Sequence, residues 1–293
     1  MVRLAIQVPL IIKQPILSRK SFERSASVRA TWVVVIAVFL PVVALFFSCT
    51  RSARNSSATE PLLVYCAASV KPPLEAAARE YQKRYGVQID LTFGGSQTLL
   101  ANVSLSRLGD LYIPADDSYI DLARRKELIG EALPLAEMTA ILATIKNQNI
   151  QSLADLINSK LTIAQANPDA AAIGKLVREK LSPAQWEALR TRTSVFTATV
   201  TEAANDVKLG AVQAALIWDA MSPQYADLKL IHLPELEPVK AKIAVAVLKC
   251  SRQSTAALRF AHFLAAADGG LPHFARNGFR VVQGEKWNER SAN

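Results

Sequence analysis

Short apolar runs alternate with helix-like segments along this chain. Residues 62–67 form an apolar run, residues 87–93 alternate apolar and polar side chains, and residues 111–113 form a third short apolar run. Residues 72–85 and 97–106, which lie between these runs, carry apolar residues at helical spacing. Strands that alternate with helices predict βαβ units, and therefore an α/β fold with a largely parallel sheet.

The same alternation resumes later in the chain. We expect further strands at residues 140–145, 161–164, 214–218 and 242–248, and helices at residues 118–128, 152–157, 171–181 and 254–266. Gly130 is expected to stop the helix at 118–128. Two more helices are predicted from capping-box spacing, which places Ser182 three residues before Gln185 and Thr199 three residues before Glu202.

A chain of 293 residues has room for one large or two modest domains. We predict two α/β lobes joined by a hinge of two crossings, near residues 137–140 and 234–240. Lobe 1 would comprise residues 62–139 and 236–290, and lobe 2 would comprise residues 140–235, inserted into lobe 1.

The N-terminal segment resembles a targeting signal rather than part of the folded protein. Residues 1–30 are basic, residues 31–48 form an uncharged apolar run, and Cys49 follows Ser48. A basic region, an apolar core and a small residue before the cleavage point describe an export signal. A cysteine after that point resembles a bacterial lipoprotein signal, in which the cysteine is acylated. An uncleaved anchor remains the alternative for residues 1–48, because such a run can span a bilayer.

Both alternatives place the remaining chain outside the cytoplasmic membrane, in the periplasm, attached to the membrane by a lipid or a helix. Residues 49–61 are then a flexible tether. Beyond residue 48 the chain holds 28 Lys and Arg against 24 Asp and Glu, so the net charge of +9 comes largely from the signal. This balance gives no reason to expect nucleic acid as a partner.

The residues that could perform chemistry are scarce. The three histidines and three cysteines lack metal-ligand spacing, and no nucleophile elbow or phosphate loop is present. We therefore expect a binding protein without catalysis, without a cofactor and without a structural metal. Cys66 and Cys250 could form a disulfide if their strands were neighbours, or they could remain free thiols.

Three turns share a geometry that suits an anion. At residues 67–69, 94–96 and 199–201 a strand ends, a small polar turn follows and a helix begins. Helix N-termini leave backbone N–H groups unpaired and carry partial positive charge, so several converging ends form an anion site. Each turn alone is equally consistent with a simple helix cap.

At these residues the chain resembles the molybdate-binding proteins of ABC importers, over roughly residues 62–282. The segments that carry the resemblance are 64–70 (VYCAASV), 92–96 (TFGGS), 109–116 (GDLYIPAD), 200–210 and 216–220 (LIWDA). The resemblance implies the type II periplasmic-binding-protein fold, a molybdate or tungstate ligand, an ABC permease as partner and a monomeric protein.

The resemblance also implies positions for the site. Ser69 and Ser96 would each offer a hydroxyl and a backbone N–H, while Ala115 and Val200 would offer backbone N–H groups. Position 218 would supply a side-chain donor from the second lobe, and here Trp218 stands where the family commonly has Tyr. Gly95 and Pro114 stand where Ser is frequent, so sulfate, phosphate or another oxyanion stays open as the ligand.

Two carboxylates near these turns have alternative roles. Glu202 either reaches the ligand or completes its capping box, and Asp219 either reaches the ligand or braces its turn near the hinge. A membrane-anchored sensor with the same fold is the alternative to a transport protein.

Overall fold

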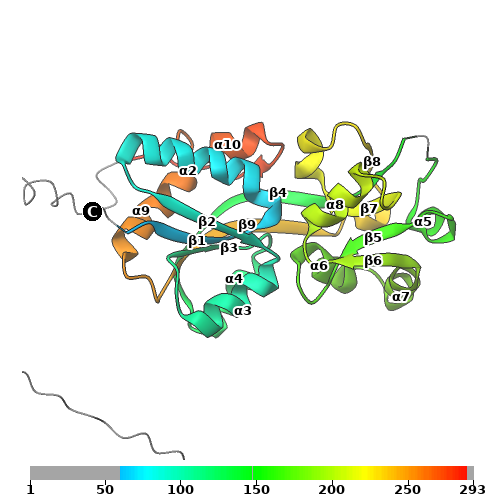
Figure 1. Ribbon diagram of the computed structural model, residues 1–293, viewed down its shortest axis with the longest axis horizontal. Helices are drawn as coiled ribbons and strands as arrows, with labels where there is room; N and C mark the ends of the chain where they lie inside the picture. The colour runs from blue at the N-terminus through cyan, green and yellow to red at the C-terminus, as the bar shows by residue number, and fades with distance from the viewer. Residues whose placement is uncertain (1–59, 147, 289–293) are drawn as a thin grey trace, which may run out of the picture. The chain divides into compact units, whose positions relative to one another are not determined.

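Residues 60–146 and 148–288 are described by a computed structural model, in which one mixed sheet runs through two lobes (Figure 1). The strand order is β2-β1-β3-β9-β4-β7-β5-β6, and β8 and β10 pair with β4 off this path. The predicted signal or anchor, with the lipidation candidate Cys49, lies outside the described residues. Within the described part of the chain, no helix is both long and apolar enough to cross a membrane.

The first lobe contains β1, β2, β3, β9, β10 and the first part of β4, with helices on both sides of the sheet. Its strands are β1 Leu62–Ala67, β2 Ile89–Gly94, β3 Leu111–Ile113, β4 Ile129–Thr144, β9 Lys240–Leu248 and β10 Arg280–Val281. Its helices are η1 Ala68–Val70, α2 Lys71–Tyr85, α3 Ser96–Ser106, α4 Ser118–Arg125, α9 Ser254–Leu264 and α10 Leu271–Arg276. In Figure 1, α2 and α10 lie on one side of the sheet, and α3 and α4 lie on the other.

The second lobe is built on the last part of β4. Its other strands are β5 Ile163–Ala166, β6 Thr193–Thr197, β7 Ala214–Trp218 and β8 Lys229–Ile231. Its helices are α5 Leu153–Asn158, α6 Ala172–Lys180, α7 Pro183–Arg192, α8 Val200–Lys208, η2 Asp219–Gln224 and η3 Pro234–Leu236. The predicted capping box of Ser182 and Gln185 is present at the start of α7, which confirms that reading of the sequence.

Strand β4 connects the lobes by changing its partner. Thr139 pairs with Lys240 of β9, whereas the next residue, Ala140, pairs with Trp218 of β7. The chain returns to the first lobe between η3 and β9. The lobe boundaries at 139/140 and 235/236 remain our proposal, and this change of partner supports the first of them.

The prediction of a largely parallel sheet was only partly right. Strands β1, β2 and β3 are parallel to one another, as are β5, β6 and β7. Strands β4 and β9, however, run antiparallel to all the strands with which they pair. They differ because they connect the lobes instead of belonging to βαβ units.

The region around Gly130 was also read incorrectly from the sequence. The helix predicted for residues 118–128 ends at Arg125, because Glu127 adopts a positive φ of 54°. Gly130 lies inside β4, which begins at Ile129, and β4 is therefore much longer than the predicted strand at 140–145. The pairing of β4 with β9 is interrupted by register shifts between Ile129 and Ala136, which explains how strand structure tolerates Gly130 and Pro134 there.

Aromatic packing closes the outer side of the first lobe. The Tyr81 ring of α2 lies 4.8 Å from the Phe260 ring and 5.0 Å from the Phe263 ring of α9, centroid to centroid. Each such pair contributes about 0.5–1.5 kcal/mol beyond the area it buries. The contact holds the helix that follows β1 in place, and so fixes where the first anion turn begins.

Cys66 and Cys250 are free thiols. Cys66 lies in β1 and Cys250 lies in the turn after β9, and β3 separates these two strands because it pairs with β1 on one side and with β9 on the other. Of the two arrangements that the sequence left open, the structure therefore has the unpaired one. Burial raises the pKa of the Cys66 thiol well above its ordinary value, and burial also raises that of Cys250.

Candidate anion site

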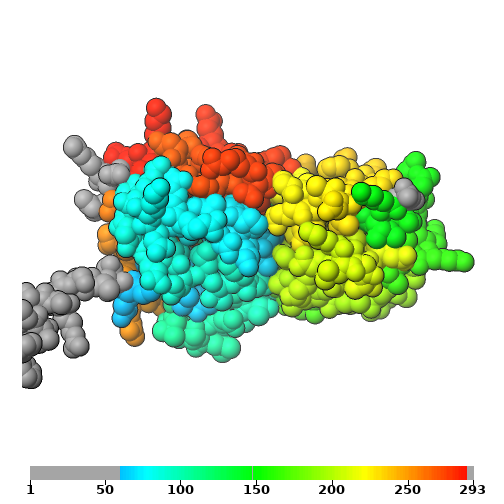
Figure 2. Space-filling model, turned by 45° about the horizontal axis from the view of Figure 1, so that its top comes forward, coloured from blue at the N-terminus to red at the C-terminus, as the bar shows by residue number. Residues whose placement is uncertain are grey.

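A small cavity of about 10 Å³ lies where the two lobes meet. Figure 2 shows the lobes pressed together along a seam without an open cleft on this face. All five ligand-binding residues predicted from the sequence line the cavity, including Ala115. The lining residues are Ala67, Ala68, Ser69, Gly94, Gly95, Ser96, Ala115, Ala171, Ala172, Ile173, Thr199, Val200 and Trp218.

The N-termini of four helices border this cavity. Lining residues stand at the starts of η1, α3, α6 and α8, two from each lobe. Parallel strands end at one edge of a sheet, so the turns after β1, β2, β5 and β6 converge there. The first-turn N–H groups of a helix have no intrahelical acceptor, and their partial positive charge favours an anion.

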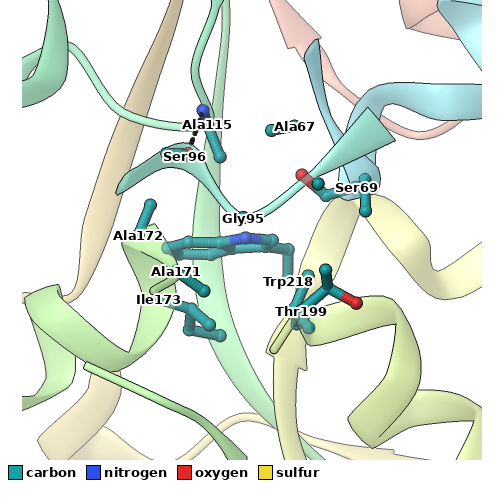
Figure 3. A pocket seen from close by; sticks show the side chains of 13 residues that line it. Ala67, Ser69, Gly95, Ser96, Ala115, Ala171, Ala172, Ile173, Thr199 and Trp218 are labelled. Atoms are coloured by element: carbon teal, nitrogen blue, oxygen red, sulfur yellow. Dashed lines mark hydrogen bonds between the residues drawn. The ribbon is translucent and has the colours of Figure 1, made fainter. Parts of the chain in front are cut away.

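Ser69 contributes a buried hydroxyl to the lining of this cavity. The residue is only 2 % exposed, and its Oγ has no hydrogen-bond partner among the described residues. In Figure 3 the hydroxyl of Ser69 points toward the space it encloses with Ser96 and Ala115. A buried hydroxyl without a hydrogen-bond partner costs folding free energy. A ligand with an acceptor oxygen at this place would remove that cost.

Trp218 presents a second unsatisfied donor from the opposite lobe. It ends β7, is fully buried, and its Nε1 has no hydrogen-bond partner among the described residues. The indole ring lies across one side of the cavity in Figure 3. Because an indole N–H donates and cannot accept, any polar group that satisfies it must be an acceptor.

Ser96 differs from these two residues, because its hydroxyl already has a partner. The backbone N–H of Ala115 donates to Ser96 Oγ at 3.1 Å, and the Tyr112 hydroxyl donates to the Ser96 carbonyl at 2.7 Å. As an acceptor from Ala115, Ser96 Oγ keeps its own hydrogen available for a ligand. Burial raises the pKa of Tyr112 well above its ordinary value, so its hydroxyl remains a donor.

None of the lining residues carries an ionisable side chain. Lys71, which follows the first turn, lies outside the cavity with its ammonium 5.2 Å from the Phe93 ring centroid and 3.9 Å from Glu75. The described residues contain no group of three or more His, Cys, Asp or Glu side chains arranged to hold a metal ion. What the cavity offers is a set of neutral hydrogen-bond donors.

Glu202 and Asp219 are both outside the cavity lining. The Glu202 carboxylate accepts from the Ala198 N–H at 2.9 Å, while the Glu202 N–H donates to Thr199 Oγ1 at 3.2 Å. Glu202 therefore caps the start of α8. Its carboxylate accepts from the N–H of the residue before the N-cap, whereas in a standard capping box it would accept from the N-cap N–H itself.

Asp219 braces the connection between the lobes, which was one of the two roles considered for it. Its carboxylate accepts from the Thr139 N–H at 2.8 Å and is bonded to Arg280. Arg280 also donates to Thr139 Oγ1 at 2.8 Å. These contacts tie the end of β7 to the position where β4 changes partner.

The start of α6 is the part of the cavity that sequence reasoning missed. Ala171, Ala172 and Ile173 line the cavity, and the N-cap Ala171 makes no side-chain cap hydrogen bond. Without a polar residue, this turn carries no capping signal. Its position after β5, at the same edge as the other turns, was the only available indication.

Comparison with known proteins places this architecture in a family. Residues 62–280 match the family described as bacterial extracellular solute-binding protein. The molybdate-binding protein ModA of Mycobacterium tuberculosis is 25 % identical over 240 residues, which cover 78 % of this chain and 90 % of that protein.

Two solved structures share the fold. The periplasmic molybdate-binding protein of Azotobacter vinelandii superposes with a TM-score of 0.65 at 18 % identity, covering 76 % of this chain and 100 % of that one. The sulfate-binding protein SubI of M. tuberculosis has a TM-score of 0.67 at 15 % identity, covering 76 % and 87 %. Both are consistent with the type II periplasmic-binding-protein fold expected from the sequence. The chain therefore belongs to the bacterial extracellular solute-binding proteins, which serve ABC importers.

Proposed function

We propose that this protein captures molybdate between its two lobes and delivers it to the permease of an ABC importer. One observation carries the proposal. Ser69 Oγ and Trp218 Nε1 are buried donors without partners in the part of the chain that the structure describes, and they line one cavity whose lining has no ionisable side chain. An oxyanion between the lobes would give each of them an acceptor.

The donor-only character of the cavity favours a fully deprotonated oxyanion. Such an ion accepts hydrogen bonds at every oxygen and donates none, which matches hydroxyl, indole and first-turn N–H groups. A phosphate that retains a proton would need an acceptor for it, and no carboxylate lines the cavity. Molybdate and tungstate share this charge and shape, so we expect both to bind.

The comparisons support molybdate, but they also include structures of proteins with other ligands, among them sulfate and phosphorylated compounds. The mycobacterial relative and the Azotobacter structure are molybdate-binding proteins, whereas the SubI structure is a sulfate-binding protein. Sulfate has the same charge and tetrahedral shape but is smaller. Discrimination would therefore depend on how closely Trp218 and the opposing turns fit the ion.

We further propose how the protein works and where. A ligand that contacts both lobes shifts the population toward the closed form, which the permease would then recognise. Export would place the protein in the periplasm. There it would act as a monomer and without catalytic activity. Acylation of Cys49, or the uncleaved segment 1–48, would hold it at the membrane.

A thermal-shift panel with molybdate, tungstate, sulfate and phosphate tests the proposal. A ligand present at 100 times its dissociation constant stabilises a protein by about 2.7 kcal/mol. For a chain of this size, each 1 kcal/mol raises Tm by about 2–4 °C. We expect shifts with molybdate and tungstate. A shift with sulfate alone would identify sulfate, not molybdate, as the ligand. If none of the four anions shifts Tm, an oxyanion site is refuted.

A further inference from the structure

Lys175 reaches across the boundary between the lobes. It lies on α6 of the second lobe, and its ammonium donates to the hydroxyl of Ser118 on α4 of the first lobe at 2.6 Å. The same nitrogen lies 5.0 Å from the centroid of the neighbouring Tyr119 ring. One side chain thus makes both a charged hydrogen bond and a cation–π contact with the opposite lobe.

The contact continues toward the cavity. The Ser118 hydroxyl donates to Oδ1 of Asp116, which also accepts from the Ser118 N–H at 3.1 Å. Asp116 is only 3 % exposed, and it directly follows the cavity residue Ala115. Since the Ala115 N–H donates to Ser96 Oγ, a continuous set of contacts joins Lys175 to the anion-facing turn.

The charges around Lys175 make this contact more than a surface ion pair. Its side chain is 24 % exposed, and its nearest acid on its own helix is Glu179, with an oxygen 3.7 Å from the ammonium. On the facing lobe, the Ser118 hydroxyl connects the ammonium to the buried Asp116 carboxylate. A partly shielded cation that one hydroxyl connects to a buried carboxylate is screened less by solvent and salt than an exposed pair.

We propose that Lys175 is a positioning residue for the anion site: it holds the lobes closed and fixes the 115–118 turn without touching the ligand. The proposal rests on the clamp proposed above and adds the residue that sets its closed state. Separation of the lobes would break the contacts of the ammonium with Ser118 and Tyr119, because both residues belong to the first lobe, and would leave only the contact with Glu179. Loss of the contact should therefore act mainly on ligand escape.

A second contact across the same boundary provides a direct readout of closure. The backbone N–H of Gln97 on α3 donates to the Ala170 carbonyl of the second lobe at 3.0 Å. Hydrogen exchange at this amide is slow only while the lobes are together. The amide involves no side chain, so it reports closure independently of any substitution at 175.

The test compares Lys175→Met, which keeps the aliphatic length, with Lys175→Arg, which keeps the charge. Lys180→Met is the matched control, because Lys180 is an exposed lysine on the same helix. For each variant, stopped-flow tryptophan fluorescence gives the rate constants for sodium molybdate. Hydrogen exchange measures the Gln97 amide with and without molybdate, and thermal unfolding without ligand measures stability.

We expect Lys175→Met to weaken molybdate binding about tenfold, mainly through faster dissociation. The Gln97 amide should exchange faster in this variant while Tm without ligand stays close to wild type. Lys175→Arg should restore most of the affinity, and Lys180→Met should behave as wild type. Wild-type dissociation and Gln97 exchange in Lys175→Met would overturn the proposal.

The test separates this proposal from the assignment of the ligand. If the wild-type protein binds no molybdate, the proposed function fails, but exchange at Gln97 in the ligand-free protein still tests Lys175. Faster exchange there in Lys175→Met than in Lys180→Met would support the role in closure, and equal exchange would refute it.

Discussion

The hydroxyl of Ser69 and the indole N–H of Trp218 belong to different lobes, yet both are buried donors that line one cavity and lack partners within residues 60–146 and 148–288. Ser69 follows β1 of the first lobe, and Trp218 ends β7 of the second. Two unsatisfied donors on opposite walls mean that a ligand accepting from both would bridge the lobes.

The Ser69→Ala variant should separate binding from stability. We expect it to weaken molybdate binding by about 1–3 kcal/mol, because the anion loses a buried donor. The free energy of unfolding without ligand should be unchanged or slightly higher, since the removed hydroxyl has no partner among the residues that the structure describes. Calorimetric titration and urea unfolding measure the two quantities.

Ser96→Ala is the matched control for this prediction. Its hydroxyl accepts from the Ala115 N–H, so its loss should lower both affinity and stability without ligand. A loss of stability in Ser69→Ala equal to that in Ser96→Ala would contradict the assignment of Ser69 as an unsatisfied donor.

Gly95→Ala should prevent full closure of the lobes. A Cβ at this position would lie 2.4 Å from the Ala170 carbonyl oxygen and 2.8 Å from that of Ala198, both in the second lobe. The backbone at Gly95, with φ −72° and ψ 143°, suits alanine, so the open form is not strained. We expect at least about a tenfold loss of molybdate affinity, with little change in Tm without ligand.

Gly130→Ala provides the comparison for Gly95→Ala. A Cβ at Gly130 would meet nothing closer than the Val247 carbonyl oxygen at 3.9 Å, within the first lobe. Its molybdate affinity should equal that of the wild type. Wild-type affinity in Gly95→Ala would show that ligand binding does not require the close contact between Gly95 and the Ala170 carbonyl of the second lobe.

Affinity for molybdate should depend little on pH. Because no ionisable side chain lines the cavity, we expect a constant dissociation constant from about pH 6 to about pH 9, where His and Cys side chains ordinarily titrate. Calorimetric titrations across this range in one ionic strength make the measurement. A dissociation constant that changed tenfold across the range would indicate a titrating side chain at the ligand.

Cys250 and Cys66 should differ in their reaction with thiol reagents. Burial raises the pKa of both thiols, and that of Cys66 is raised furthest. The thiolate is the reactive form, so labelling should accelerate as the pH rises through each raised pKa. We expect the half-buried Cys250 to label in the folded protein and Cys66 only after unfolding. Mass spectrometry of labelled peptides distinguishes the two, and equal labelling of Cys66 in the folded protein would contradict its burial.

Much of the fold could be predicted because its local signals were strong. The strands at 62–67, 111–113 and 214–218 were placed correctly from apolar runs alone, and Gly86 ends α2 with the positive φ expected of a terminating glycine. Strand β6 was missed, because it is a short edge strand in which the two apolar residues, Val195 and Phe196, are adjacent and exposed and do not alternate with polar residues. Gly130 and Pro134 obscured the first part of β4, because both residue types ordinarily interrupt a strand. The register shifts that accommodate them appear only in the pairing with β9.

The site was predictable where side chains mark it and hidden where only backbone forms it. Ser69 and Ser96 stand at strand–helix turns that the sequence makes visible, and Val200 follows a capping threonine. Ala171 has no such mark, and the contact of Lys175 with Ser118 depends on how the lobes meet. Such contacts between lobes are tertiary, and no local pattern encodes them.

Diffraction from crystals grown or soaked with molybdate, recorded at the molybdenum absorption edge, would locate the bound anion. We predict one anomalous peak in the cavity, with oxygens of the anion accepting hydrogen bonds from Ser69 Oγ and Trp218 Nε1. A peak elsewhere, or an empty cavity between closed lobes in crystals soaked at saturating molybdate, would contradict the proposed function.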